Sequence, residues 1–156
     1  MSRHMEPPEL VFAASIRVRV AAPVDLLGGQ QGHRRLVPII GGRVDGPLLV
    51  GEVLPVGMDN QILWTPTLTE LRAQYALRLD DGALVYVDNA GIRTGEPSAM
   101  AALARGEEVD PALVHFRTAP RLSSSSPDWE WLDRTFFIGV GTREPELVRI
   151  DLFQVS

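Results

Sequence analysis

Residues 68–87 read LTELRAQYALRLDDGALVYV, and this stretch decides the fold class. Between residues 71 and 79 apolar side chains occupy every second position, and mostly polar side chains lie between them, as in a strand with two different faces. A helix is the alternative, but its apolar stripe would include Arg78. The Asp-Gly pair at 81–82, with apolar runs on both sides, is typical of a hairpin turn. The stretch therefore predicts two antiparallel strands joined by a tight turn.

Extended patterns recur along the rest of the chain. Residues 9–20 alternate over twelve positions, and residues 147–155 alternate again. The other extended segments are RRLVPII (34–40), LLVGEVLP (48–55), LVHFRTAP (113–120) and RTFFIGVG (134–141). Pro38 cannot donate a backbone hydrogen bond, so we expect a bulge or a sheet edge there. The segment PSAMAALARG (97–106) alone has the early proline, helix formers and final glycine of a helix.

Seven or eight strands with one short helix exclude a doubly wound fold, which needs helices between parallel strands. We predict an all-β protein, an antiparallel β-barrel of about eight strands with one short helix. A sandwich fits the spacing equally well. The chain of 156 residues is expected to form a single domain over residues 1–156, with residues 1–8 as a flexible N-terminal segment. Periodicity does not decide whether the polar strand faces turn toward solvent or toward a lumen.

Composition excludes several functional classes. The chain has no cysteine, which removes disulfides, thiolate nucleophiles and zinc-thiolate sites. All 15 basic residues are arginine, which removes lysine-based catalysis. A net charge of −5 argues against nucleic-acid binding. No run approaches the ~18 apolar residues of a membrane span, and the N-terminus lacks a secretory signal, so a cytoplasmic protein without membrane contact is expected. No nucleotide-binding motif occurs, and we predict neither cofactor nor metal.

The first candidate site is GMDNQ, residues 57–61, directly after a strand-like run. On an extended backbone Asp59 and Gln61 face the same way, and the end of a barrel strand lies at the rim, where ligands bind. Asp59 would then act as a general base, with Gln61 holding a carbonyl or hydroxyl group of the substrate. The alternative is a plain turn, because Asp and Asn readily bind their own backbone.

Arg117 is the second candidate. It lies between strand-like residues, so we expect it to be at least half buried and to need an acidic partner or an anionic ligand. A structural carboxylate and a bound carboxylate or enolate both satisfy that need. His115 shares the face of Arg117 in a regular strand, and it is either a substrate-binding acid–base group or a hydrogen-bonded structural residue.

Four aromatic residues complete the candidates. Tyr75 and Tyr86 come from the two arms of the hairpin, and each phenol would donate to a developing oxyanion or simply fill its strand. Trp129 and Trp131 follow a serine run. They would line an aromatic cavity that binds substrate, or form a plug that seals one end of the barrel.

Four ordered blocks resemble a known family. They are RRLVPIIGGRVDGPLLVGEVLPVGMDNQ (34–61), YALRLDDGALVYVDNAGIR (75–93), ARGEEVDPALVHFRTAPRL (104–122) and WLDRTFFIGVG (131–141). Together they resemble the mostly bacterial domain of unknown function 3237, over nearly the whole chain. The family's Gly-Ala-Asp-Trp-Gln is matched at Gly57, Asp59 and Gln61, and its Phe-Arg-Thr-x-Pro is matched at residues 116–120. This chain departs from the family at Met58, Asn60, Leu122, Ser123 and Asp133.

The resemblance implies a barrel of the allene oxide cyclase-like kind, often a homodimer, with a polar internal pocket. Related barrels include cyclases, which suggests a lyase or isomerase by analogy of fold. We therefore expect a cofactor-independent lyase, isomerase or cyclase that acts on a small, activated, cyclic or carbonyl-bearing metabolite, hydrophobic or aromatic in character. Asp59 would move the proton, and Arg117 and Tyr75 or Tyr86 would stabilise the enolate-like charge. The alternatives are a non-catalytic binding protein for such a metabolite and a structural subunit.

Overall fold

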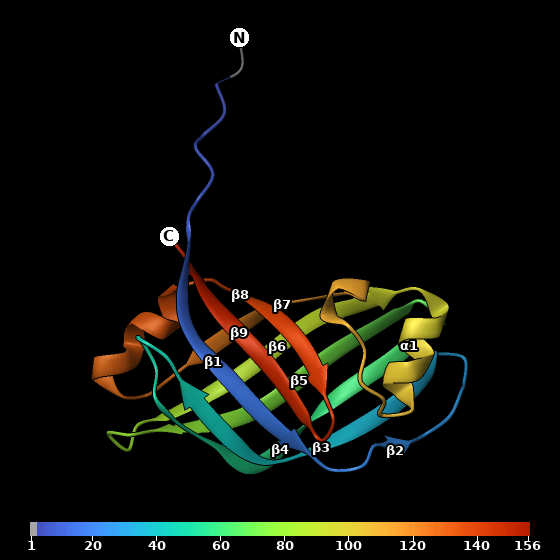
Figure 1. Ribbon diagram of the computed structural model, residues 1–156. Coiled ribbons are helices and arrows are strands. Elements are labelled where there is room, and N and C mark those ends of the chain that lie inside the picture. The colour runs from blue at the N-terminus through green and yellow to red at the C-terminus, as the bar shows by residue number, and fades with distance from the viewer. Residues whose placement is uncertain (1–2) are drawn as a thin grey trace.

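Eight long antiparallel strands close into a barrel in the computed structural model, which describes residues 3–156 (Figure 1). The strands are β1 (Leu10–Val20), the two-residue β2 (Val24–Asp25), β3 (His33–Asp45), β4 (Gly51–Thr65), β5 (Leu68–Leu79), β6 (Leu84–Gly95), β7 (Val114–Ser123), β8 (Phe137–Glu144) and β9 (Leu147–Val155). The helix α1 spans Pro97–Ala104, and two 3-10 helices, η1 and η2, span Pro111–Leu113 and Pro127–Arg134. The predicted barrel of about eight strands is confirmed, and so is the predicted helix near residues 97–106.

Strands β3 to β9 pair in chain order, β9 pairs with β1, and β1 pairs with β3 to close the barrel. Closure gives each long strand a neighbour on both sides, although β7 and β8 pair at only two positions, Arg117↔Val140 and Thr118↔Gly139. At the β1–β3 seam Gly42 has a φ of +147°, and a Cβ atom there would lie 1.9 Å from the carbonyl oxygen of Arg17. The pairing of β3 with β4 shifts between Pro38 and Gly42, which confirms the bulge expected at Pro38.

The hairpin predicted for residues 68–87 is confirmed. β5 and β6 pair without a register shift from Leu68↔Thr94 to Arg78↔Leu84. In the turn Asp81 accepts a hydrogen bond from the backbone N–H of Ala83 at 2.9 Å. The alternating apolar residues of β5 face the barrel interior, so two-residue periodicity was the correct basis for choosing a strand over a helix.

Strand β4 corrects one expectation, because GMDNQ neither ends a strand nor forms a plain turn. Val53 pairs with Leu77 and Gly57 pairs with Tyr75, so four positions of β4 span two positions of β5. Pro55 lies in this bulge, where no ladder donor is needed. Gly57 has a φ of +95°, and a Cβ there would lie 2.0 Å from the carbonyl oxygen of Gln74. After the bulge β4 continues, and the following polar residues lie in mid-strand.

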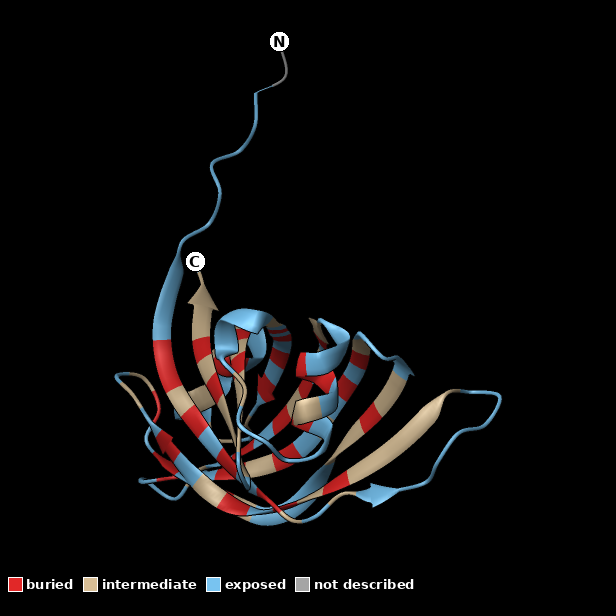
Figure 2. Cartoon of the chain, turned by 45° about the vertical axis from the view of Figure 1, so that its right-hand side comes forward, coloured by how far each residue is buried: buried red, intermediate tan, exposed pale blue. Residues whose placement is uncertain are grey.

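The two ends of the barrel differ. The 3-10 helix η2 lies at one end and α1 lies at the opposite end, as Figure 1 shows. Bands of buried residues alternate with exposed ones along the strands (Figure 2), and the apolar core includes Leu77, Val87, Leu132, Phe137 and Leu152. Within residues 3–156, no helix combines the length and the apolar composition needed to cross a bilayer.

Candidate functional site

Polar side chains gather on the inner wall of β4, β5 and β6. Asp59 pairs with Ala73, and Ala73 pairs with Asn89 on the next strand. Residues in direct register project to the same face of a sheet, so Asp59 and Asn89 flank the short side chain of Ala73. Tyr75 lies two positions further along β5 on the same face and is 4% exposed. The barrel interior therefore contains a polar cluster rather than an uninterrupted apolar core.

A cavity of about 40 Å³ lies against this cluster. The polar residues of its lining are Asp59, Tyr75, Asn89 and Thr118. The rest of its lining is apolar: Val18, Val20, Ile39, Leu71, Ala73, Phe116, Val148 and Ile150. A space with mostly apolar walls and a few convergent polar groups is typical of a small-molecule site.

Five buried polar atoms in this region have no hydrogen-bond partner among residues 3–156. They are Oδ1 of Asp59, the hydroxyl of Tyr75, Oδ1 of Asn89, Nε of Arg93 and Oγ1 of Thr118. Buried polar atoms are nearly always hydrogen-bonded in native proteins, because an unmade bond costs ~1–3 kcal/mol. Four of the five residues line the cavity, and Arg93 lies outside its lining. Such a concentration of unmade bonds indicates a place where a ligand supplies the missing partners.

Asp59 combines one fixed oxygen with one free oxygen. Gln61 donates from Nε2 to Oδ2 of Asp59 at 2.8 Å, whereas Oδ1 is buried without a partner. Burial raises the pKa of the Asp59 carboxyl, and the hydrogen bond from Gln61 and the charge of Arg93 oppose that rise. A carboxylate with a raised pKa is a stronger base, so Oδ1 is chemically suited to accept a proton.

Tyr75 is suited to the opposite role. Burial, and secondarily the charge of Asp59, raises the pKa of its phenol far above the ordinary value. The hydroxyl therefore stays protonated throughout the neutral range and keeps a hydrogen to donate. A buried donor next to a buried base is the arrangement needed to stabilise an oxyanion while a proton is removed.

A second, wider pocket of about 160 Å³ lies next to the cavity at the α1 end. Asp59 and Val148 line both spaces, so Asp59 stands where the cavity and the pocket meet. Arg35, Arg93 and Arg143 also line the outer pocket, with Leu103, Ala104, Arg105 and Gly106 from the end of α1 and the residues after it. We call the side chains of Arg35, Arg93 and Arg143 the mouth arginines.

Burial affects two of the mouth arginines. Arg93 is 7% exposed, and burial lowers its pKa to about 10, against the opposing effect of Asp59. Burial also lowers the pKa of Arg143, and the neighbouring charge of Arg35 adds to that effect. The guanidinium carbon of Arg93 lies 5.5 Å from the centroid of the Phe116 ring, which fixes its position over the aromatic face.

The prediction that Arg117 is at least half buried is wrong, and His115 shares its face as expected. Both residues are exposed, because on β7 the inward positions are Phe116, Thr118 and every second residue after them. Arg117 donates from Nη1 to the carbonyl oxygen of Phe116 at 2.9 Å and does not face the cavity. The structure therefore separates Arg117 and His115 from Asp59 and Tyr75.

Three aromatic residues predicted to bind substrate also lie away from the cavity. Tyr86 is 49% exposed on the outer face of β6. Trp129 and Trp131 belong to η2, at the end opposite α1, where Trp131 packs against Phe137 with 6.3 Å between ring centroids. Trp129 donates from Nε1 to Asp81 at 2.7 Å. The two tryptophans match the alternative of a plug that seals one barrel end, and Tyr86 is a surface residue.

Sequence reasoning missed Asn89 and Arg93, although a signal was present. Inward-facing positions on β6 continue from Val85 and Val87 through Asn89 to Arg93. Counting by two from the apolar start of the strand places both polar residues inside. Among the described residues, no three His, Asp or Glu side chains lie close enough to hold a metal ion.

Comparisons with known proteins agree with this architecture. The model of a family described as "Protein of unknown function (DUF3237)" matches residues 8–155. A UPF0311 protein of Rhodopseudomonas palustris is 43% identical over 145 residues, which cover 93% of this chain and 94% of that protein. A crystal structure of a conserved protein of unknown function from the same organism matches with a TM-score of 0.93 and 40% identity, covering 97% of this chain and all of the other.

A more distant structure shares the fold. It is described as an enzyme from Penicillium herquei, and it matches with a TM-score of 0.74 at 18% identity over the full length of both chains. That identity is low, so the likeness extends to the barrel fold alone. The family model covers nearly all of the chain, and a relative above 40% identity covers most of it. The chain therefore belongs to the DUF3237 family of proteins of unknown function.

Proposed function

We propose that the protein is a cofactor-independent lyase, isomerase or cyclase that removes a proton from a carbon next to a carbonyl group of a small substrate. The observation that carries the proposal is the pair formed by Oδ1 of Asp59 and the hydroxyl of Tyr75, both buried, both without a partner and both against one cavity. The pair supplies a base and an oxyanion donor within a site that excludes most water.

In the proposed step Oδ1 of Asp59 takes the α-proton, and the electron pair of the broken C–H bond moves toward the carbonyl oxygen. Tyr75 donates a hydrogen bond from its hydroxyl to the developing enolate oxygen and keeps its proton. Gln61 holds Oδ2, so that Oδ1 keeps its direction. The enolate then loses a leaving group, is protonated elsewhere or closes a ring. A departing leaving group accepts the proton held by Asp59, and in the last two cases Asp59 returns that proton to the product.

We assign to Arg93 the role predicted for Arg117, which is to stabilise the enolate-like charge. Arg93 is buried on the inner wall and its Nε has no partner among the described residues. Its positive charge stabilises negative charge that develops near Asp59. Proton transfer by one placed group contributes ~10²–10⁴-fold, and an oxyanion donor contributes ~10²–10³-fold. These contributions suffice for an activated substrate. The fold is compatible with catalysis, since the structural match from Penicillium herquei is described as an enzyme.

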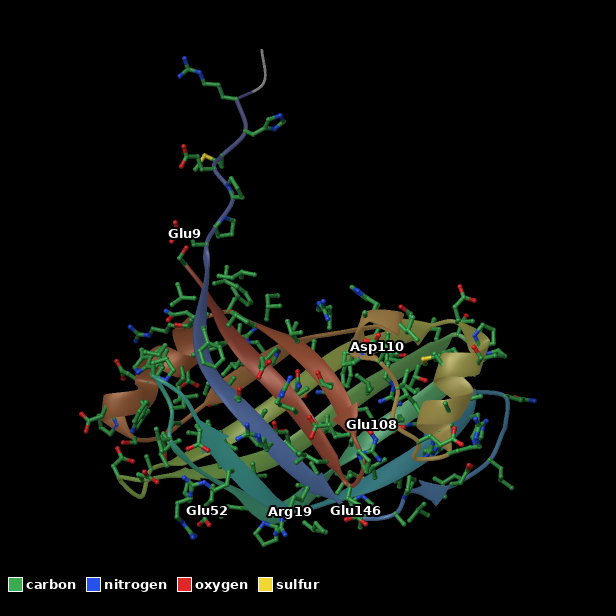
Figure 3. The ribbon with its side chains drawn as sticks, in the orientation of Figure 1. Glu9, Arg19, Glu52, Glu108, Asp110 and Glu146 are labelled. Carbon is green, nitrogen blue, oxygen red and sulfur yellow. The ribbon has the colours of Figure 1, made fainter. Side chains whose placement is uncertain are left out.

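The test is hydrogen–deuterium exchange on small enolisable ketones and α,β-unsaturated carbonyl compounds. Compounds that bind are incubated with the protein in D₂O, and loss of the α-proton signal is followed by ¹H NMR. We expect exchange with at least one compound, and Asp59→Asn should slow it ~10²–10⁴-fold. The control is Glu52→Gln on the same strand, since Glu52 lies at the outer surface (Figure 3) and pairs with Arg78 at 3.1 Å. Binding without exchange would instead favour a non-catalytic binding protein.

A further inference from the structure

The outer pocket has an excess of positive charge in a protein that is negative overall. Its lining contains the three mouth arginines and one carboxylate, Asp59, which gives a formal charge of +3 − 1 = +2 when Asp59 is ionised. Arg105 also lines the pocket, but it pairs with Glu107 at 2.7 Å. The whole chain has a formal charge of −5, so the excess is local.

The mouth arginines lack acidic partners of their own. No ion pair within 4 Å involves Arg35, Arg93 or Arg143 in the part of the chain that the structure describes, although eight other pairs occur there. Arg143 uses Nη1 to donate to the carbonyl oxygens of Glu144 at 2.8 Å and of Leu147 at 3.3 Å, which holds it at the rim. A partly buried guanidinium without a counter-charge is costly, so an anion is the missing component.

We propose that the substrate is a small organic anion whose carboxylate binds the mouth arginines while its apolar body enters the inner cavity. A carboxylate is planar and offers two oxygens, which match the paired N–H groups of a guanidinium. Asp59 stands at the junction, so a carbon just inside the carboxylate would lie next to Oδ1. This inference deepens the proposed function and rests on it for the reactive position.

The walls of the two spaces support this orientation. The inner cavity is lined mostly by apolar residues, including Ile39, Leu71 and Phe116, and it would bury a hydrocarbon or aromatic body. The outer pocket is the larger of the two and holds the guanidinium groups. A neutral compound could use the inner cavity but would leave the mouth arginines without a counter-charge.

The test compares acids with their amides, which share shape but not charge. Crotonate and crotonamide, and cinnamate and cinnamamide, are titrated by ligand-observed NMR, with inorganic phosphate as a competitor. At least one acid should bind tenfold or more tightly than its amide, because bonds between charged groups are roughly twice as strong as neutral ones. Arg93→Gln should reduce that ratio to about one. Arg35→Gln should also reduce it, and because Arg35 is only half buried, this second variant should keep the core intact.

The matched control is Arg117→Gln, which removes an arginine from the outer face of β7 and should preserve the ratio. Equal binding of acid and amide, no binding of either acid, or a ratio that survives both mouth substitutions would overturn the proposal. Phosphate that displaces the acid at equal concentration would overturn the assignment to a carboxylate. Thermal unfolding of each variant separates loss of binding from loss of folding.

Asp59→Asn distinguishes this proposal from the proposed function. It should slow deuterium exchange ~10²–10⁴-fold but keep the preference for the acid, because it removes a base and a negative charge and leaves the arginines in place. A preserved acid preference without exchange in the unaltered protein would contradict the catalytic proposal alone. Exchange without acid preference would contradict the anion site alone.

Discussion

Gln61 donates a hydrogen bond to Oδ2 of Asp59 at 2.8 Å, and this contact leaves Oδ1 as the free oxygen of the carboxylate. The bond stabilises the ionised form and so lowers the pKa of Asp59 against the effect of burial. Gln61→Met should therefore raise that pKa and move the acidic limb of the rate–pH profile of deuterium exchange to higher pH. Gln74→Met, on the exposed face of β5, should leave the profile unchanged.

Asp59 should also make stability depend on pH. Its folded-state pKa is raised, so the folded protein holds this proton more tightly than the unfolded chain does. The contribution of Asp59 to the free energy of unfolding is greatest below its unfolded pKa of about 4 and is lost as pH rises through the folded value.

Asp59→Asn removes this ionisation, so it should stabilise the protein at pH 7 by ~1–3 kcal/mol, the usual cost of a buried group with unmade hydrogen bonds. The gain should shrink toward pH 4. Urea unfolding at several pH values measures it. A gain that is constant from pH 4 to pH 7 would contradict burial as the cause of the raised pKa.

Tyr75 and Tyr86 provide a matched pair for the oxyanion role. Tyr75→Phe removes a buried hydroxyl that has no partner, so exchange should slow ~10²–10³-fold while stability stays the same or rises. Tyr86→Phe alters a half-exposed residue on the outer face and should affect neither quantity. A rate loss in Tyr75→Phe that parallels a fall in melting temperature would indicate a structural role instead.

The barrel could be predicted from the sequence because alternation is a local property of each strand. Residues 71–79 and the Asp-Gly turn at 81–82 carry their own evidence, and the hairpin formed as expected. Bulges carry weaker signals. Pro55 and Gly57 suggested the end of a strand. Strand β4 instead continues past them, because its two extra residues form a bulge opposite β5.

The candidate site could be predicted only in part. A residue can act in the lumen only if its side chain points inward, and the sequence does not show which of the two faces of each strand is the inner one. Asp59, Gln61 and Tyr75 lie on the inner wall as expected. Arg117 lies at an outward position of β7, and Arg93 on the neighbouring strand β6 supplies the buried guanidinium. The predicted homodimer concerns a surface that a single chain does not test, so it stays a prediction.

Trp131 should matter for stability rather than for ligand binding. It packs against Phe137 and the apolar core at the η2 end, away from the lining of either pocket. Trp131 is partly buried, so Trp131→Ala should cost less than the ~3–5 kcal/mol typical of a large aromatic side chain removed from a core, but still a measurable amount. Affinity for crotonate or cinnamate, measured at a temperature where the variant is folded, should change less than twofold. A large loss of affinity with the fold intact would return Trp131 to the binding site.

Gly57 and Gly82 test whether the β4 bulge positions the site. Both have a positive φ, +95° and +89°, but a Cβ at Gly57 would lie 2.0 Å from the carbonyl oxygen of Gln74, whereas nothing lies within 4 Å of one at Gly82. Gly82→Ala should therefore cost only the ~1–2 kcal/mol of a left-handed conformation.

Gly57→Ala should cost more, because β4 must also move away from β5 just before Asp59. It should slow deuterium exchange in the fraction that remains folded, because displacement of β4 moves Oδ1 relative to Tyr75. Chemical unfolding and exchange, measured together on both variants, give the comparison. Equal costs for the two substitutions would mean that the close approach of β4 to β5 at Gly57 does not constrain the strand.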